Sequence, residues 1–116
     1  MGRLTTHVLD TTRGKPAAGL KIELYRLDGG RSMIKALVTN QDGRVDAPLL
    51  DGAALTRGQY ELVFAVAEYF RAAGVMITDP PFLDSVPVRF AVADPAQHYH
   101  VPLLVSPYGY TTYRGS

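Results

Sequence analysis

Three histidines and one arginine are the side chains of this sequence best suited to chemistry near neutral pH, namely His7, His98, His100 and Arg44. An unperturbed imidazole changes charge close to neutral pH, so each histidine can accept or donate a proton. Arg44 follows an Asp-Gly pair and carries a planar, permanently charged guanidinium that can hold a carbonyl or an anionic heterocycle. These side chains suit acid–base hydrolysis, in which an imidazole activates water and a fixed cation stabilises negative charge.

Two other interpretations of the histidines stay open. One is a surface histidine without a catalytic role, because histidine is commonly part-exposed. The other is a zinc site built from three imidazole nitrogens, although no carboxylate is placed by the sequence to orient them. The chain has no cysteine, which excludes disulfides and thiolate chemistry, and it has no Gly-x-Ser-x-Gly nucleophile elbow. We expect neither a metal nor another cofactor.

Alternation with a period of two places the histidines on strands. His98 and His100 fall on one face of a predicted strand, and the opposite face carries the apolar residues Tyr99, Val101, Leu103 and Val105. His7 shares its face with Thr5 on an earlier strand. Both histidine faces are therefore expected to point away from the core.

The same alternation recurs in residues 20–24, 34–38, 60–66 and 86–92, with turn residues between the runs. In the second of these runs, Ile34, Ala36 and Val38 are the expected apolar face. Short strands at this spacing predict a sandwich or barrel. Pro87 and Pro102 interrupt strand-like runs and are expected at strand ends, edges or bulges.

One segment departs from the β pattern. Residues 67–73 are rich in helix formers, and Gly74 stands where a helix would end, so we predict about two helical turns. The 116 residues predict a single domain, 1–116, with 47% hydrophobic and 20% charged residues, as in soluble globular proteins. A net charge of +1 with scattered basic residues predicts no nucleic-acid partner. The apolar runs are too short for a membrane span, and the N-terminus has no signal-like run, which predicts a cytoplasmic protein.

The chain ends on Tyr113-Arg114-Gly115-Ser116. Chain ends are usually loose unless something holds them. Here an aromatic, β-prone stretch, residues 106–112, leads into the end. We therefore expect the chain to reach its last residue inside a strand.

Four motifs together resemble the 5-hydroxyisourate hydrolases, the transthyretin-related enzymes of urate degradation. They are Leu4-Thr5-Thr6-His7-Val8-Leu9-Asp10, Asp42-Gly43-Arg44, His98-Tyr99-His100-Val101-Pro102-Leu103-Leu104 and the terminal tetrapeptide. The resemblance covers almost the whole chain. It implies an all-β, transthyretin-like, eight-stranded sandwich of two sheets with one short helix, assembled as a homotetramer, a dimer of dimers.

The resemblance also implies the roles of the site residues. His7, Arg44, His100 and Ser116 are the expected catalytic residues, and Tyr113, Arg114, Gly115 and His98 are expected to bind the substrate. The implied reaction is metal-free hydrolysis of 5-hydroxyisourate to 2-oxo-4-hydroxy-4-carboxy-5-ureidoimidazoline by opening the N1–C6 amide. Two alternatives remain: a non-catalytic, transthyretin-like carrier of a small aromatic ligand, and a structural β-sandwich module. Fold alone does not decide between them.

Overall fold

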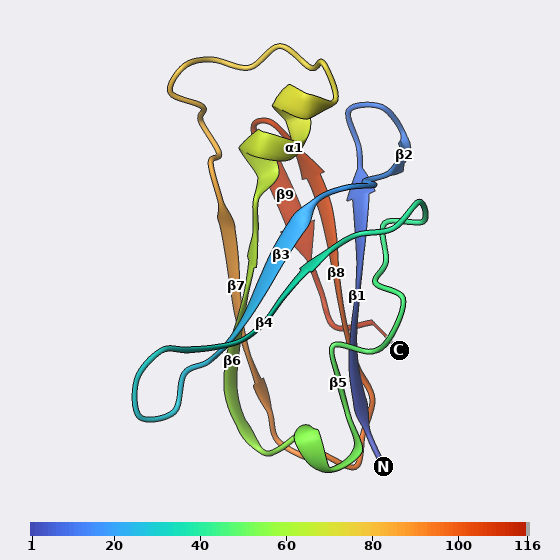
Figure 1. The fold of residues 1–116 in the computed structure, drawn as a ribbon, viewed down its shortest axis with the longest axis vertical. Coiled ribbons are helices and arrows are strands. Elements are labelled where there is room, and N and C mark those ends of the chain that lie inside the picture. The colour runs from blue at the N-terminus through green and yellow to red at the C-terminus, as the bar shows by residue number, and fades with distance from the viewer. Residues whose placement is uncertain (116) are drawn as a thin grey trace.

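Two β-sheets pack face to face in the computed structural model, which describes residues 1–115 (Figure 1). The first sheet has the order β2-β1-β8-β9, with β5 also pairing with β1, and consists of β1 (Arg3–Asp10), β2 (Lys15–Pro16), β5 (Leu50–Asp51), β8 (Tyr99–Ser106) and β9 (Gly109–Thr112). The second has the order β4-β3-β6-β7 and consists of β3 (Lys21–Arg26), β4 (Ser32–Val38), β6 (Gly58–Phe64) and β7 (Val86–Val92). One α-helix, α1 (Val66–Ala72), lies at one end of the sandwich (Figure 1).

The all-β class, the two sheets and the single short α-helix were predicted and are confirmed. The strand count differs from the expected eight, since residues 1–115 contain nine strands and a 3-10 turn, η1 (Gly52–Ala54). Two of the nine, β2 and β5, are only two residues long and pair briefly with β1. Pro16 ends β2 and has no backbone N–H with which to extend the ladder.

The inner faces of the two sheets form one hydrophobic core. In β1, buried and less buried residues alternate along the whole strand, as the period of two predicted. The fully buried core side chains include Leu4, Val8, Ile22, Leu24, Leu62, Phe64, Leu103 and Val105. The face of β1 and β8 that carries the histidines is the outer one.

The prediction for residues 34–38 is wrong in its choice of face. Ile34 is 38% exposed and Val38 is 55% exposed, whereas Leu37 packs against the core. The strand concerned, β4, is the outermost strand of its sheet. In its pairing with β3, Leu37 lies opposite the buried Ile22 and Val38 lies opposite the exposed Lys21, and residues opposite each other point to the same side of the sheet.

The predicted helix is confirmed as α1. The N–H groups of Gly74 and Val75 donate to the carbonyls of Arg71 and Phe70, each at 3.0 Å, which is the Schellman pattern of a helix end. Within residues 1–115, no helix has the length and apolar character needed to cross a membrane.

A buried carboxylate ties the end of β1 to the helix. The fully buried Asp10 side chain accepts hydrogen bonds from the Tyr69 hydroxyl at 2.8 Å and from Arg13 Nε at 2.9 Å. Burial acts to raise the pKa of Asp10, but the hydrogen bonds from Arg13 and Tyr69 outweigh burial and lower it. Asp10 is therefore ionised in the folded protein at neutral pH.

Candidate active site

Parallel pairing of β1 with β8 brings the histidines onto one surface. In this ladder Thr5 lies opposite His100 and His7 lies opposite Pro102. Partners in register point to the same side of a sheet, so His7 and His100 share the outer face. His98 is exposed, while His7 and His100 are half-buried. The predicted orientation of the histidine face is confirmed.

The turn before Arg44 is docked on β1. The Val8 N–H donates to the Gly43 carbonyl at 2.8 Å, and Gly43 has a positive φ of 74°. A β-carbon at position 43 would lie 2.3 Å from the Val8 carbonyl oxygen. Only glycine fits this approach without strain, and the approach carries Arg44 to the edge of the histidine surface.

The side chain of Asn40 organises the same turn. Its Oδ1 accepts the backbone N–H of Asp42 at 2.9 Å and that of Arg44 at 3.2 Å. Its Nδ2 donates to Asp46 Oδ1 at 3.0 Å, and its backbone N–H donates to the Arg44 carbonyl at 2.7 Å. These bonds fix the backbone on both sides of Arg44. Asparagine is a common turn residue because its side chain hydrogen-bonds the backbone two residues further along. This signal at Asn40 could have indicated from the sequence that the turn before Arg44 is fixed.

Arg44, His98 and His100 line one cleft of about 460 Å³, together with Arg3 and Thr5. His7 stands at the next outward position of β1 beyond Thr5, beside this cleft rather than in its wall. Sequence reasoning missed Arg3 and Thr5 as site residues. Both alternate in phase with His7, so extending the face of His7 along the strand would have found them.

Thr5 fixes the orientation of His100. Its Oγ1 lies 2.8 Å from His100 Nδ1. When Nδ1 carries the ring proton and donates to this hydroxyl, Nε2 holds a free lone pair and can accept a proton. A neutral imidazole held in this way is suited to act as a general base.

Both half-buried histidines are shifted toward the neutral form. Burial lowers the pKa of His100, and the positive charge of Arg44 and the neighbouring His7 lower it further. Burial likewise lowers the pKa of His7, with Arg44 adding to the effect and the Asp42 backbone and carboxylate opposing it. At neutral pH both rings are therefore neutral, with one nitrogen free to accept a proton, as a base that activates water requires.

The end of the chain returns to His100. Gly115 forms an isolated bridge with His100, and its N–H donates to the His100 carbonyl at 2.8 Å. A β-carbon at position 115 would lie 2.6 Å from His100 Cδ2, so the backbone of Gly115 packs directly against the imidazole. Ser116, an expected catalytic residue, lies outside the described residues.

The strand that leads towards the chain end is interrupted after Thr112, and the expectation for Ser116 itself lies outside the described residues. β9 ends at Thr112, which pairs with Leu103, and pairing resumes only at Gly115. Hydrogen-bonded pairs alternate along an antiparallel ladder. The bond from Gly115 to His100 therefore makes Pro102 and Tyr113 the next such pair. Pro102 has no N–H to donate, so the ladder is interrupted there, as the expectation of irregular pairing at Pro102 anticipated. Pro87 lies on the edge strand β7, also as expected.

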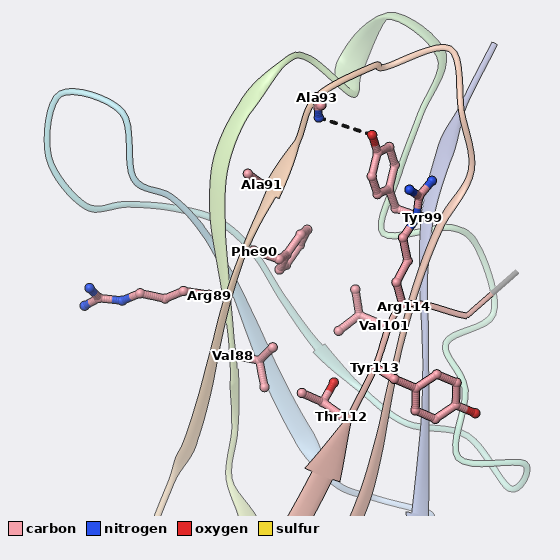
Figure 2. Close-up of a pocket in the computed structure, with 10 residues that line it drawn as sticks. All are labelled: Val88, Arg89, Phe90, Ala91, Ala93, Tyr99, Val101, Thr112, Tyr113 and Arg114. Carbon is pink, nitrogen blue, oxygen red and sulfur yellow. Dashed lines mark hydrogen bonds between the residues drawn. The ribbon is translucent and has the colours of Figure 1, made fainter.

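Tyr113 and Arg114, released from the ladder, point in different directions. Both residues border a pocket of about 300 Å³ that Phe90, Tyr99 and Val101 also line. Tyr113 is 57% exposed, and Figure 2 shows its ring directed away from those three side chains. The Arg114 guanidinium lies over the ring of Tyr99, with Cζ 4.1 Å from the ring centroid (Figure 2). Tyr99 belongs to the inner, core-facing side of β8, so this guanidinium lies on the opposite side of the sheet from the imidazole of His100.

The described part of the chain offers no set of ligands for zinc. Within residues 1–115, no group of three histidine, cysteine, aspartate or glutamate side chains comes together in a way that could hold a metal ion. The site thus combines imidazole, guanidinium and hydroxyl groups around an open cleft, a combination suited to proton transfer and to binding a polar or anionic ring.

Comparison with known proteins places the chain. The HIUase/Transthyretin family model matches residues 4–115. The chain belongs to this family. Its resemblance to the 5-hydroxyisourate hydrolases, noted from the motifs, is confirmed by relatives of that name at high identity.

One such relative in the HIUase/transthyretin family is 5-hydroxyisourate hydrolase 2 of Rhizobium meliloti (strain 1021), which is 64% identical over 99% of this chain and 97% of the relative. Among solved structures, an (S)-allantoin synthase has a TM-score of 0.95 and 48% identity over 99% of this chain. This chain spans only 44% of that synthase chain. Sea bream transthyretin in complex with thyroxine has a TM-score of 0.86 and 28% identity over 97% of this chain and 94% of the transthyretin.

Proposed function

We propose that this chain hydrolyses 5-hydroxyisourate to 2-oxo-4-hydroxy-4-carboxy-5-ureidoimidazoline. The observation that carries the proposal is the cleft in which His100, oriented by Thr5, faces the same space as Arg44. Full-length relatives named for this activity support it. The carrier alternative rests on the fold shared with transthyretin. The sea bream transthyretin is 28% identical to this chain, whereas the Rhizobium meliloti hydrolase is 64% identical to it.

The first step of the proposed reaction is attack by water on C6 of the substrate. Nε2 of His100 takes a proton from the water as its oxygen bonds to C6. The pKa of His100 is lowered by burial and by Arg44, so the ring is available as a base at neutral pH. His7, whose pKa is lowered by burial and Arg44 in the same way, works in concert with His100.

Arg44 stabilises the charge that develops in this step. As water adds, negative charge gathers on the C6 oxygen, and a guanidinium already held in place stabilises that charge without reorganising. The turn docked on Val8 and bonded to Asn40 holds the Arg44 backbone for this role. The N1–C6 bond then breaks as N1 takes the proton that the imidazole accepted from water, and C6 becomes the carboxyl group of the product, which releases its proton to solvent at neutral pH.

The remaining expected residues surround this centre. His98 shares the cleft with His100, and it also lines a neighbouring hollow with Tyr113, Arg114 and Gly115. We propose that His98, Tyr113 and Gly115 border the bound substrate, whereas the guanidinium of Arg114 is bonded to Gln97 and to the His98 carbonyl. Ser116, through its hydroxyl or the terminal carboxylate, is proposed to hold substrate or water next to them.

The proposed site is enclosed only when copies of the chain assemble. The histidine face lies on the outside of a single sandwich, where it makes an open site. A second copy placed against this face would turn it into the wall of an enclosed pocket. We therefore propose a homotetramer, a dimer of dimers. A fully active monomer in dilute solution, identified by sedimentation together with activity, would contradict this assembly. The cytoplasmic location stays a prediction.

The experiment that tests the function follows the loss of freshly made 5-hydroxyisourate by absorbance, against its spontaneous decay. We expect the protein to accelerate the loss in proportion to its concentration. A rate equal to that of the blank, with saturable binding of the substrate measured by calorimetry, would favour the carrier instead.

A further inference from the structure

Arg114 belongs to the terminal motif, for which the resemblance implies substrate binding, and in the structure its guanidinium is bonded within the chain. Its Nη2 donates to Gln97 Oε1 at 3.0 Å and to the His98 carbonyl at 3.1 Å. Its guanidinium also covers the ring of Tyr99 (Figure 2). These three partners are consecutive residues that lead directly into His100.

The partners of Arg114 form a fixed platform. Tyr99 is only 6% exposed, and its hydroxyl accepts the backbone N–H groups of Ala93 at 3.1 Å and of Asp94 at 3.0 Å. The Gln97 N–H donates to the Asp94 carbonyl at 3.1 Å. A guanidinium bonded to two acceptors and stacked on an aromatic ring uses the planar geometry that distinguishes arginine from lysine.

The tail needs such an anchor at this point. Because Pro102 cannot donate to Tyr113, the ladder is open between Thr112 and Gly115. Gly115 nevertheless donates to the His100 carbonyl at 2.8 Å and packs against the His100 ring. Arg114 bridges this gap from the opposite side of the sheet.

We propose that Arg114 is a positioning residue, which latches the end of the chain onto residues 97–99 and thereby seats Gly115 against His100. Arg114 lines the same hollow as His98 and Gly115, but its guanidinium is already bonded to Gln97 and the His98 carbonyl, so its proposed effect on the reaction passes through Gly115 and His100. This inference rests on the proposed hydrolysis for its kinetic consequence, but the latch itself is a property of the protein without substrate.

The latch and a substrate contact predict different kinetics for Arg114→Gln. If Arg114 is a latch, its substitution leaves Gly115 no longer held against His100. In that case kcat falls by roughly tenfold to a hundredfold, with a smaller change in KM. Gln97→Ala removes the side-chain acceptor of the Arg114 guanidinium and is expected to lower kcat as well. The double variant Arg114→Gln with Gln97→Ala is then less impaired than the sum of the single effects predicts. Arg114→Lys recovers only part of the loss. The matched control is Arg71→Gln, an exposed arginine on α1, which leaves kcat unchanged.

Hydrogen exchange of the Gly115 amide tests the latch without substrate. In the wild-type chain the bond to His100 protects this amide, and in Arg114→Gln we expect its exchange to be faster by about tenfold or more. Unchanged exchange, or a raised KM with kcat preserved, would overturn the latch. If the wild-type chain fails to hydrolyse 5-hydroxyisourate, the proposed function fails, and the exchange measurement still decides on the latch.

Discussion

The backbone of Gly115 lies directly against the imidazole of His100. The contact joins the end of the chain to the centre of the site, and the Gly115 N–H donates to the carbonyl of the same residue. A β-carbon at position 115 would be 2.6 Å from Cδ2 and 3.2 Å from Cγ of the ring. Real β-carbons do not come that close, so any larger residue forces either the ring or the tail to move.

Gly115→Ala therefore impairs catalysis without unfolding the sandwich. The His100 ring is held on its other side by Thr5, so the added methyl displaces the ring or the tail, and kcat falls by roughly tenfold to a hundredfold. The control is Gly109→Ala, where an added β-carbon meets nothing within 4 Å. Steady-state kinetics and thermal unfolding of both variants check the prediction. Equal activity of Gly115→Ala and wild type would show that the contact has no bearing on catalysis.

Thr5→Val tests the orientation of His100. Valine keeps the shape of threonine but removes the hydroxyl 2.8 Å from Nδ1, so the ring loses the bond that selects its tautomer. We expect kcat to fall by about tenfold, and Thr5→Ser, which keeps the hydroxyl, to recover most of it. The ¹⁵N shifts of His100 report the tautomer directly. The same shifts in Thr5→Val and wild type would argue against an orienting role.

The pH dependence follows from the two lowered histidine pKa values. Burial and Arg44 lower the pKa of His100 from its ordinary value of 6.5, so the neutral base persists below that pH. The acid limb of kcat/KM in the wild-type chain should therefore lie below pH 6.5.

Removing Arg44 shifts this limb. In Arg44→Gln the charge that disfavours protonation is gone, and the pKa of His100 rises. The acid limb of the remaining activity then moves to higher pH, and an NMR titration of the His100 ring follows it. A limb that stays in place, or moves to lower pH, would contradict the coupling.

Asp10→Asn lowers stability in a pH-dependent way. The folded-state pKa of Asp10 lies below its ordinary value of 3.8. Its stabilising effect is thus complete above that value and is lost as the pH falls through the folded-state pKa. At pH 7 we expect the substitution to cost about 1.5–3 kcal/mol in the free energy of unfolding, the range for hydrogen bonds to charged groups.

The gap between wild type and Asp10→Asn should narrow in acid. Urea unfolding at pH 7 and near pH 3 measures it, with the exposed Asp51→Asn as the control. A gap that is the same at both pH values would mean that ionisation of Asp10 is not the source of the stabilisation.

Local patterns predicted those parts of the fold that depend on neighbours along the chain. The alternation in β1 and β8 placed His7 and His100 on the outer face, and helix formers ending at Gly74 located α1. The failures lie where distant segments decide. The face of β4 depends on its pairing with β3, in which Leu37 lies opposite Ile22, and no pattern within residues 34–38 reveals that register.

The sequence predicted which histidine and arginine residues belong to the candidate site, but not the residues that hold them in place. Motif resemblance supplied His100 and Arg44, whereas the structure adds Thr5 and Asn40, which hold them. A threonine opposite a histidine is visible only once β1 and β8 are known to pair in parallel. For Arg114 the resemblance implied substrate binding, which stays a prediction, whereas the contacts of its guanidinium with Gln97 and Tyr99 are visible only in the structure.

The role of His100 as the base is decided by comparing wild type with His100→Ala in the loss of freshly made 5-hydroxyisourate. Removing a general base typically costs about 10²–10⁴-fold, so His100→Ala should be slower by that factor while keeping the wild-type circular dichroism spectrum. A folded His100→Ala protein that turns over substrate at the wild-type rate would contradict the assignment of catalysis to this cleft.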